Sequence, residues 1–255
     1  MITRIIYPFR LREIISQRVA KFFPNLNETD VSLAFNRKIK LDLSKNDHAH
    51  RFIIFNGFVE LKLTKDIIKL AKKGGIFIDV GANYGYYSCL WAAQNINNKV
   101  VAFEASPVNI EPLMNNVKKN NLKELIKIEP FALGKEKGIS KFEIGKESGW
   151  GGLTIINKPE TIEINVCTLD DYVENNDITH IDVLKIDTEG ADTWVLYGAE
   201  KLLREKKIKH IFFERNIPRM RELGIEINDA KNFLESHNYI VKEHSFWEIF
   251  YAYPK

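Results

Sequence analysis

Cysteine is scarce in this chain, and its two cysteines are far apart. Cys89 and Cys167 lack the paired spacing of a zinc site or of a disulfide framework, which favours an intracellular protein. No segment approaches the roughly 18 consecutive apolar residues of a membrane-spanning helix. The N-terminus also lacks the apolar core and cleavage site of a secretion signal. We therefore expect a cytoplasmic protein.

An excess of charge of one sign is also missing. The chain has 37 lysines and arginines against 34 aspartates and glutamates, a formal net charge of +3. Nucleic-acid-binding domains usually concentrate positive charge on one face, so this balance argues against a nucleic-acid partner and favours a small molecule. Hydrophobic residues make up 45% of the chain, as in ordinary globular proteins. We expect a folded domain with a sizeable core.

Residues 1–23 interleave basic and apolar side chains with helical spacing. Arg4, Arg10, Arg12 and Arg18 alternate with isoleucine, leucine, phenylalanine and valine. Such an amphipathic helix most often covers its own domain. The alternative is contact with a partner protein or with the inner face of a membrane, to which the protein would then be peripheral.

The hydrophobic pattern divides the chain near residue 73. Residues 38–63 alternate apolar and polar side chains around the turn dipeptide Asn56-Gly57, which predicts strands joined by tight turns. A helix is expected from Leu63 to Lys72. We interpret residues 1–73 as an N-terminal α/β extension and residues 74–255 as one larger domain.

Strands and helices alternate through the larger domain. Predicted strands occupy residues 76–80, 99–103, 126–130, 181–186 and 209–214, and predicted helices occupy residues 84–94, 107–121, 192–205 and 228–237. Strands separated by helical lengths predict a parallel sheet in a doubly wound α/β fold. Two closing strands at 239–243 and 247–251 are joined by a short turn, which predicts an antiparallel last strand in a sheet of seven.

The alternation breaks between residues 138 and 168. Short alternating runs at 139–144 and 161–168 flank the glycine-rich segment from Ser148 to Gly152. We interpret this region as a β-hairpin insertion with a flexible tip. Trp150 at the tip can close over a bound substrate, with the neighbouring glycines as hinges, or it can be part of an ordinary hairpin end.

The strongest local signal is the segment from Asp79 to Gly85, where an apolar strand runs into a small-residue turn and then a helix. Gly81 and Gly85 allow the backbone to approach a ligand closely, and the helix N-terminus offers unpaired N–H groups. The spacing Gly-x-x-x-Gly differs from the three-glycine pattern of dinucleotide sites, whose second glycine admits a pyrophosphate. A nucleoside cofactor without phosphates fits better. Alternatively, the glycines serve only helix–strand packing.

Two later strand ends complete the candidate cofactor site. Glu104 ends the next strand about 20 residues after the turn, where an acidic side chain can hold ribose hydroxyls. Ser106 is expected to be the N-cap of the following helix. Phe131 and Ala132 follow the third strand and can lie against a flat base, although core packing explains Phe131 equally well.

These segments resemble the FkbM family of S-adenosylmethionine-dependent methyltransferases. The resemblance rests on Asp79 to Gly85, Glu104 to Pro107, Ala132 to Gly134 and Leu184 to Gly190, and it extends to residues 41–44, 51–60, 195–199 and 213–214. It implies a Rossmann-like class I methyltransferase fold and, usually, O-methylation. It also implies that S-adenosylmethionine is bound by Asp79, Gly81, Asn83, Gly85, Glu104 and Ser106. The acceptor does not follow from the resemblance, and a hydroxyl on a small molecule or glycan is our expectation.

Methyl transfer from a sulfonium is an in-line displacement, which gains from alignment of the acceptor and exclusion of water. Asp187 and Glu189 follow the fourth strand at the ligand-binding edge and are the candidate catalytic residues. Alternatively, Asp187 holds the cofactor's ammonium group and Glu189 favours the N-terminus of the next helix. Tyr84 can offer its ring to the sulfonium. Glu214 ends the fifth strand and, with Trp150, is the candidate acceptor-binding residue.

Other functions are weaker matches. No metal site is predicted, because His48 and His50 lack a third ligand nearby in the sequence. A nucleotide-dependent oxidoreductase would be expected to carry the three-glycine spacing. An enzyme that methylates amino groups of nucleic acids would have Asn/Asp-Pro-Pro-aromatic where this chain has Asp187 to Gly190. The second function that we retain is a catalytically inactive assembly protein that binds S-adenosylmethionine.

Overall fold

The computed structural model describes residues 30–44, 46–244 and 248–255. The amphipathic helix predicted for residues 1–23 lies outside these residues. Among the helices of the described part, none is long and apolar enough to cross a membrane.

A seven-stranded sheet forms the centre of the described structure, in the order β12-β13-β11-β10-β3-β4-β5. Its strands are β3 (Ile76–Val80), β4 (Lys99–Phe103), β5 (Ile126–Glu129), β10 (Ile181–Ile186), β11 (Ile208–Glu214), β12 (Tyr239–Glu243) and β13 (Ile249–Pro254). Strand β13 pairs antiparallel with both β11 and β12, and the other neighbouring strands pair parallel. The predicted Rossmann-like sheet with an antiparallel last strand is confirmed.

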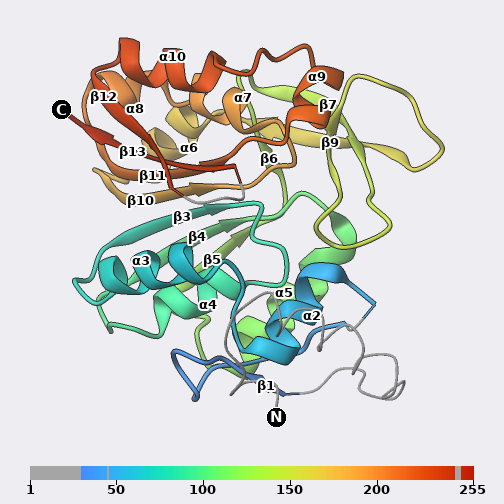
Figure 1. Cartoon of the computed structure of the whole chain (residues 1–255), viewed down its shortest axis with the longest axis vertical. Helices are drawn as coiled ribbons and strands as arrows, with labels where there is room; N and C mark the ends of the chain where they lie inside the picture. Colours follow the sequence, from blue (N-terminus) through green and yellow to red (C-terminus); the bar gives the residue numbers. More distant parts are fainter. Residues whose placement is uncertain (1–29, 45, 245–247) are drawn as a thin grey trace.

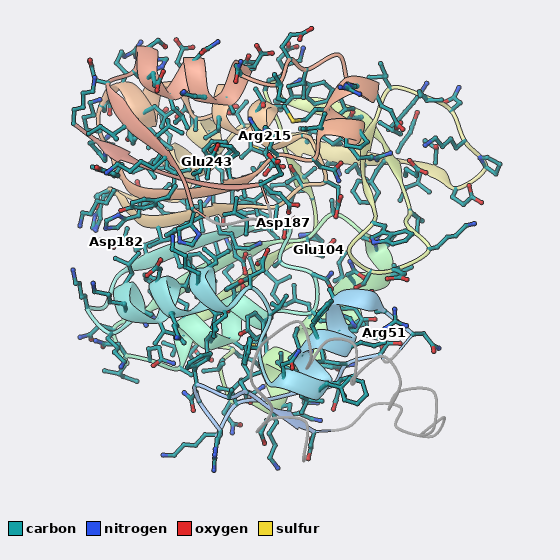
Figure 2. The ribbon with its side chains drawn as sticks, in the orientation of Figure 1. Arg51, Glu104, Asp182, Asp187, Arg215 and Glu243 are labelled. Atoms are coloured by element: carbon teal, nitrogen blue, oxygen red, sulfur yellow. The ribbon has the colours of Figure 1, made fainter. Side chains whose placement is uncertain are left out.

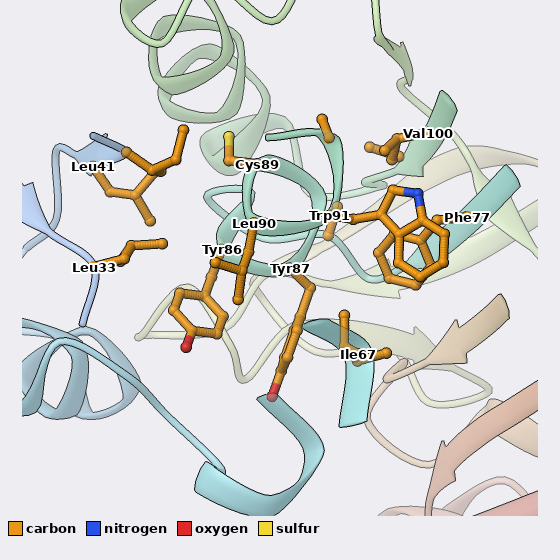
Figure 3. Close-up of a cluster of buried hydrophobic side chains, with 14 of the residues drawn as sticks. Leu33, Leu41, Ile67, Phe77, Tyr86, Tyr87, Cys89, Leu90, Trp91 and Val100 are labelled. Atoms are coloured by element: carbon orange, nitrogen blue, oxygen red, sulfur yellow. The ribbon is translucent and has the colours of Figure 1, made fainter. Parts of the chain in front are cut away.

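Helices cover both faces of this sheet (Figure 1). One layer contains α3 (Leu61–Ala71), α4 (Tyr86–Ala92) and α5 (Pro107–Lys119), and the other contains α6 (Leu169–Asn175), α7 (Asp192–Tyr197), α8 (Glu200–Arg204) and α10 (Asp229–Ser236). Successive strand residues point to opposite faces, so Phe77 belongs to the core of the first layer and Ile78 to that of the second. Figure 3 shows the first core, in which Trp91 stacks on Phe77 with ring centroids 5.1 Å apart.

The N-terminal part shares the first of these cores. Leu41 and Ile67 pack in the same buried cluster as Phe77, and the short strands β1 (Val31–Ser32) and β2 (Lys40–Leu41) pair antiparallel beside it. The division that we placed at residue 73 stays a prediction.

The strands predicted for residues 38–63 are wrong beyond β2, because residues 48–56 form the helix α2 (His48–Asn56). Gly57 has a left-handed backbone (φ 77°) and caps the end of this helix, donating from its N–H to the carbonyl of Ile53 at 2.7 Å. An Asn-Gly pair supplies positive φ in a hairpin turn and at a helix end alike. The dipeptide alone therefore could not separate the two structures.

The predicted insertion is part of a second sheet. Strands β6 (Ala132–Leu133), β7 (Gly138–Glu143), β8 (Gly152–Thr154) and β9 (Thr161–Cys167) form it in the order β6-β9-β7-β8. The antiparallel pair β7–β9 matches the predicted hairpin. Part of the expected flexible tip is ordered, because Gly152 begins β8, which pairs with β7.

Three further corrections concern the helices. The helix α6 was not predicted. The helix expected at residues 192–205 is divided into α7 and α8 at Gly198, where the chain passes so close to β6 that an added Cβ would stand 2.1 Å from the carbonyl oxygen of Gly134. The helix α9 (Ile217–Glu222) was not predicted. It begins at Asn216, whose side chain accepts a hydrogen bond from the N–H of Arg219. At Gly198 a close backbone contact interrupts the predicted helix. At Asn216 a side-chain cap begins a helix that the apolar periodicity does not indicate.

Candidate functional site

A cavity of about 370 Å³ lies at the carboxyl ends of the central parallel strands. The predicted site residues that line it are Asp79, Gly81, Asn83, Tyr84, Glu104, Ser106, Phe131, Ala132, Trp150, Asp187, Glu189 and Glu214. Figure 2 shows Glu104 and Asp187 close together after β4 and β10, whereas Asp182 marks the opposite edge of the sheet. Parallel strands bring these distant segments together at one edge.

Gly81 and Gly85 have different surroundings. Gly81 has a φ of 78°, and an added Cβ would stand 1.9 Å from the carbonyl oxygen of Asp187 at the end of β10. Gly85 has a φ of 86° and precedes α4, where an added Cβ would stand 2.6 Å from the side chain of Leu113 in α5. Gly85 is absent from the cavity wall, so its surroundings agree with a role in packing and not in ligand contact.

Glu104 is the buried carboxylate of this site, with 5% of its surface exposed. One of its oxygens accepts a hydrogen bond from the N–H of Asn83 at 2.7 Å, and the other accepts from the N–H of Ser106 at 2.8 Å. Burial raises the pKa of Glu104 to about 7 despite these bonds. Each carboxylate oxygen has two lone pairs, so Glu104 can also accept hydrogen bonds from two hydroxyls in the cavity.

Ser106 and Phe131 flank this carboxylate. Ser106 occupies the N-cap position of α5, as predicted, but its side chain makes no capping hydrogen bond. Phe131 packs edge-on against Phe103 with ring centroids 5.5 Å apart, and it also lines the cavity. The two roles considered for Phe131 are therefore compatible.

Lys185 lines the cavity and was not predicted from the sequence. It is 4% exposed, and its ammonium is 3.0 Å from Asp187 and 3.9 Å from Asp79. Burial lowers the pKa of Lys185, but the negative charges of Asp187 and Asp79 outweigh it, so the pKa is raised. A lysine near the end of a largely apolar strand could have indicated this group, because a buried positive charge needs acidic partners nearby.

Asp79 is a deeply buried member of this group. It accepts a hydrogen bond from the hydroxyl of Ser88 at 2.6 Å, and its second oxygen has no hydrogen-bond partner among the described residues. Burial raises the pKa of Asp79. The nearby ammonium of Lys185 offsets its charge.

Glu60 is a second cavity residue that sequence reasoning missed. It precedes α3 with a left-handed backbone (φ 42°), which is uncommon for a residue with a side chain. Its carboxylate accepts a hydrogen bond from the hydroxyl of Tyr87 at 2.7 Å. Burial raises its pKa, and the negative charge of Asp187 adds to the effect. No local pattern in the sequence marks this position.

Glu189 and Glu214 stand beside Asp187 on the cavity wall. Burial, with Asp187 next in effect, raises the pKa of Glu189 to about 8, although its carboxylate accepts a hydrogen bond from Asn216 at 2.6 Å. The same causes raise the pKa of Glu214 to about 10. Both side chains are therefore largely protonated near neutral pH, whereas the side chain of Asp187 is 35% exposed and paired with Lys185.

Thr188 lines the cavity and is hydrogen-bonded to the start of α7. Its hydroxyl and its N–H both donate to the carboxylate of Asp192, at 2.7 and 3.1 Å. Burial and the neighbouring Asp187 raise the pKa of Asp192 to about 6. Within the residues that the structure describes, no group of three or more histidine, cysteine or acidic side chains is placed to hold a metal ion.

Comparison with known proteins agrees with this geometry. Residues 79–241 match the family described as Methyltransferase FkbM domain. No protein of curated function matches the sequence. The chain therefore belongs to the FkbM methyltransferases, as the sequence resemblance predicted, and S-adenosylmethionine is its cofactor.

The similar solved structures include three methyltransferases of low sequence identity. An O-methyltransferase from Bacillus cereus in complex with SAH is 14% identical, with 78% of this chain and 83% of that chain covered and a TM-score of 0.45. The precorrin-6y C5,15-methyltransferase from Geobacter metallireducens is 13% identical, with coverages of 78% and 90% and a TM-score of 0.46. The tRNA methyltransferase TrmK of B. subtilis is 13% identical, with coverages of 75% and 65% and a TM-score of 0.41.

Proposed function

We propose that this methyltransferase transfers a methyl group to a hydroxyl oxygen of a small molecule or glycan. The buried Glu104 carboxylate carries the cofactor part of the proposal, because it lines the cavity and is held by two backbone N–H groups. A carboxylate at this strand end suits the two hydroxyls of a ribose. The cavity volume also falls within the range of about 300–1,000 Å³ that is usual for small-ligand sites.

The residues around Glu104 complete the proposed cofactor site. Phe131 and Ala132 would contact the base, and the turn at Gly81 and Asn83 would approach the nucleoside. Tyr84 would offer its ring to the sulfonium. Asp187, with a partly exposed carboxylate, would hold the ammonium group. When bound, S-adenosylmethionine supplies a methyl group activated by the positive charge on sulfur.

The acidic wall of the cavity supports a hydroxyl acceptor. Glu189 has a pKa of about 8 and is the better candidate to accept the proton of the acceptor oxygen, which it can do in its ionised form as the pH rises through that value. Asp187 is paired with Lys185 and is assigned to the ammonium group of the cofactor instead. Glu214, protonated near neutral pH, would donate a hydrogen bond to the acceptor. Trp150 would cover the acceptor and exclude water.

Calorimetric titration of S-adenosylmethionine and of NAD tests the cofactor site. We expect S-adenosylmethionine to bind and NAD not to bind, and we expect Glu104→Gln to weaken binding roughly tenfold or more. Glu129→Gln is the matched control, because Glu129 also ends a strand and accepts a hydrogen bond from Tyr172 at 2.8 Å, yet it is absent from the cavity wall. Binding of NAD, or equal effects of the two substitutions, would refute the assignment.

Methyl transfer to a panel of hydroxylated small molecules and glycans tests the reaction. We expect labelled methyl to appear on an oxygen of an accepted compound, and we expect Glu189→Gln to lower kcat while S-adenosylmethionine still binds. Transfer to nitrogen or carbon would overturn the assignment to oxygen. Cofactor binding with no transfer to any panel member would favour the inactive assembly protein instead.

A further inference from the structure

The start of α2 contacts two separate walls of the cavity. Asp47 is 5% exposed and precedes this helix, where one carboxylate oxygen accepts a hydrogen bond from the N–H of His50 at 3.0 Å. Its other oxygen accepts two hydrogen bonds from Ser148, at 2.7 Å from the N–H and 2.6 Å from the hydroxyl. Ser148 lies in the glycine-rich loop between β7 and β8. Asp47 therefore joins that loop to the N-terminal part of the chain.

His50 reaches the glycine turn on the other wall. Its Nδ1 accepts a hydrogen bond from the N–H of Ser44 at 3.3 Å, which places the proton on Nε2. Nε2 lies 3.3 Å from the side-chain oxygen of Asn83 and can donate to it. The N–H of Asn83 in turn donates to Glu104. Two hydrogen bonds therefore connect this buried histidine to the proposed ribose-binding carboxylate.

This meeting of aspartate, histidine and serine differs from a nucleophilic triad. In a triad the histidine accepts the proton of the serine hydroxyl. Here Nε2 of His50, which lies 3.3 Å from the hydroxyl oxygen of Ser148, already carries a proton, and that hydroxyl donates to Asp47. Burial lowers the pKa of His50, which keeps the ring neutral. The arrangement holds groups in place and does not activate Ser148.

The loop is held at Ser148 from a third direction. The side-chain amide of Asn109 in α5 donates to the carbonyl of Ser148 at 2.9 Å. The N–H, the hydroxyl and the carbonyl of Ser148 are thus all hydrogen-bonded to residues of other segments. An added Cβ at Gly149 would stand 3.7 Å from the side chain of Asn83, so the loop packs against the glycine turn. Asp47 also lines the cavity.

We propose that Asp47 and His50 are positioning residues that hold the two walls of the cofactor cavity together, Asp47 through the loop at Ser148 and His50 through the turn at Asn83. We call these four residues the cavity latch. The latch opens at the bonds between Asp47 and Ser148 to admit and release the cofactor, and it slows release when closed. The identity of the ligand rests on the proposed function, but the bonds that form the latch do not.

Hydrogen exchange and cofactor release test the latch in the full chain. In Asp47→Asn, the new side-chain NH2 group faces the backbone N–H of Ser148, and two donors cannot form a hydrogen bond. We therefore expect the amide of Ser148 to exchange at least about tenfold faster. We also expect S-adenosylmethionine to dissociate about tenfold faster, because charge-assisted hydrogen bonds are lost. Ser148→Ala removes the hydroxyl alone and should show a smaller change in the same direction.

Asp170→Asn is the matched control. Asp170 bridges the N–H groups of Lys201 and Leu202 at 2.8 and 3.0 Å, outside the cavity wall. It should change the thermal midpoint but neither Ser148 exchange nor cofactor release, which separates positioning from a general structural effect. If Asp47→Asn does not fold, Ser148→Ala supplies the test.

The outcomes separate the two proposals. Unchanged exchange at Ser148 in Asp47→Asn or Ser148→Ala overturns the latch, whatever ligand binds. Faster exchange with unchanged dissociation of S-adenosylmethionine overturns its role in cofactor release. Failure of the unaltered protein to bind S-adenosylmethionine would instead overturn the proposed cofactor site.

Discussion

The carboxylate of Glu104 accepts a hydrogen bond of 2.7 Å from the backbone N–H of Asn83, which lies in the turn after the neighbouring strand. Asn83 itself has a left-handed backbone, with a φ of 51°. Because the carboxylate is buried, the bond fixes the turn and the proposed ribose-binding group as one unit. The charge on Glu104 should therefore affect both cofactor binding and stability.

We predict that the affinity for S-adenosylmethionine rises between about pH 6 and about pH 8 and that binding releases a proton below pH 7. The pKa of Glu104 is about 7 in the folded protein, and the ionised form accepts stronger hydrogen bonds from the ribose hydroxyls than the protonated form does. Calorimetry in buffers of different ionisation enthalpy measures the proton release. In Glu104→Gln this release should disappear, and a pH-independent affinity of the unaltered protein would contradict the prediction.

The free energy of unfolding should change with pH in the opposite direction to the cofactor affinity. A carboxyl whose folded pKa is raised from 4.5 to about 7 loses stabilisation as the pH rises through that interval. The free protein should therefore be destabilised by Glu104 ionisation in the pH range where cofactor binding strengthens.

Glu214→Gln should stabilise the free protein increasingly as the pH rises. The folded pKa of Glu214 is about 10 because of burial and the charges of Asp187 and Asp192, so the unfolded chain binds fewer protons than the folded chain above the usual pKa of 4.5. The stability difference should grow by up to about 1.4 kcal/mol per pH unit. Urea unfolding at several pH values measures it.

The control for this series is Glu222→Gln, a more exposed glutamate whose side chain is 39% exposed. It removes a carboxyl that is absent from the cavity wall, so its stability differences are the reference for the series. If the two substitutions show the same pH dependence, the assignment of a raised pKa to Glu214 is wrong.

Lys185→Met should destabilise the protein by about 3–5 kcal/mol near neutral pH, because it leaves the charges of Asp79 and Asp187 without their buried cation. Without this cation the pKa of Asp79, already raised by burial, would rise further. The destabilisation should diminish as the pH falls toward the usual pKa of an aspartate, since protonation removes the unpaired charge. Thermal unfolding across this pH range measures the destabilisation. A destabilisation that does not change with pH would contradict the prediction.

Gly81→Ala should destabilise the protein more than Gly85→Ala. Both positions have left-handed backbones, for which a side chain costs about 1–2 kcal/mol. At Gly85 the new Cβ meets the end of the Leu113 side chain, which can move. At Gly81 it meets the backbone carbonyl of Asp187, which cannot move without displacing β10. Equal losses in urea unfolding would show that the close approach at Gly81 is not limiting.

The strands and most helices of the central domain were predicted from local patterns. Strands β4 and β10 have the predicted bounds, because short apolar runs buried on both faces of a parallel sheet differ clearly from their flanks. Helix α2 was missed because the alternation of residues 38–43 was extended across the consecutive apolar residues 52–55 and because Asn56-Gly57 serves a turn and a helix end equally. The break at Gly198 depends on contact with Gly134, which no local pattern contains.

The sequence by itself determined the order of the central strands, the glycine turn after β3 and the acidic residue after β4, because backbone geometry and apolar periodicity act over neighbouring residues. The tertiary structure decided which side chains share the cavity. Asp47 and Ser148 are 101 positions apart, and Lys185 meets Asp79 only because β3 and β10 pair. Hydrogen bonds and charge pairs between such distant residues depend on separation in space, so the folded chain alone brings them together.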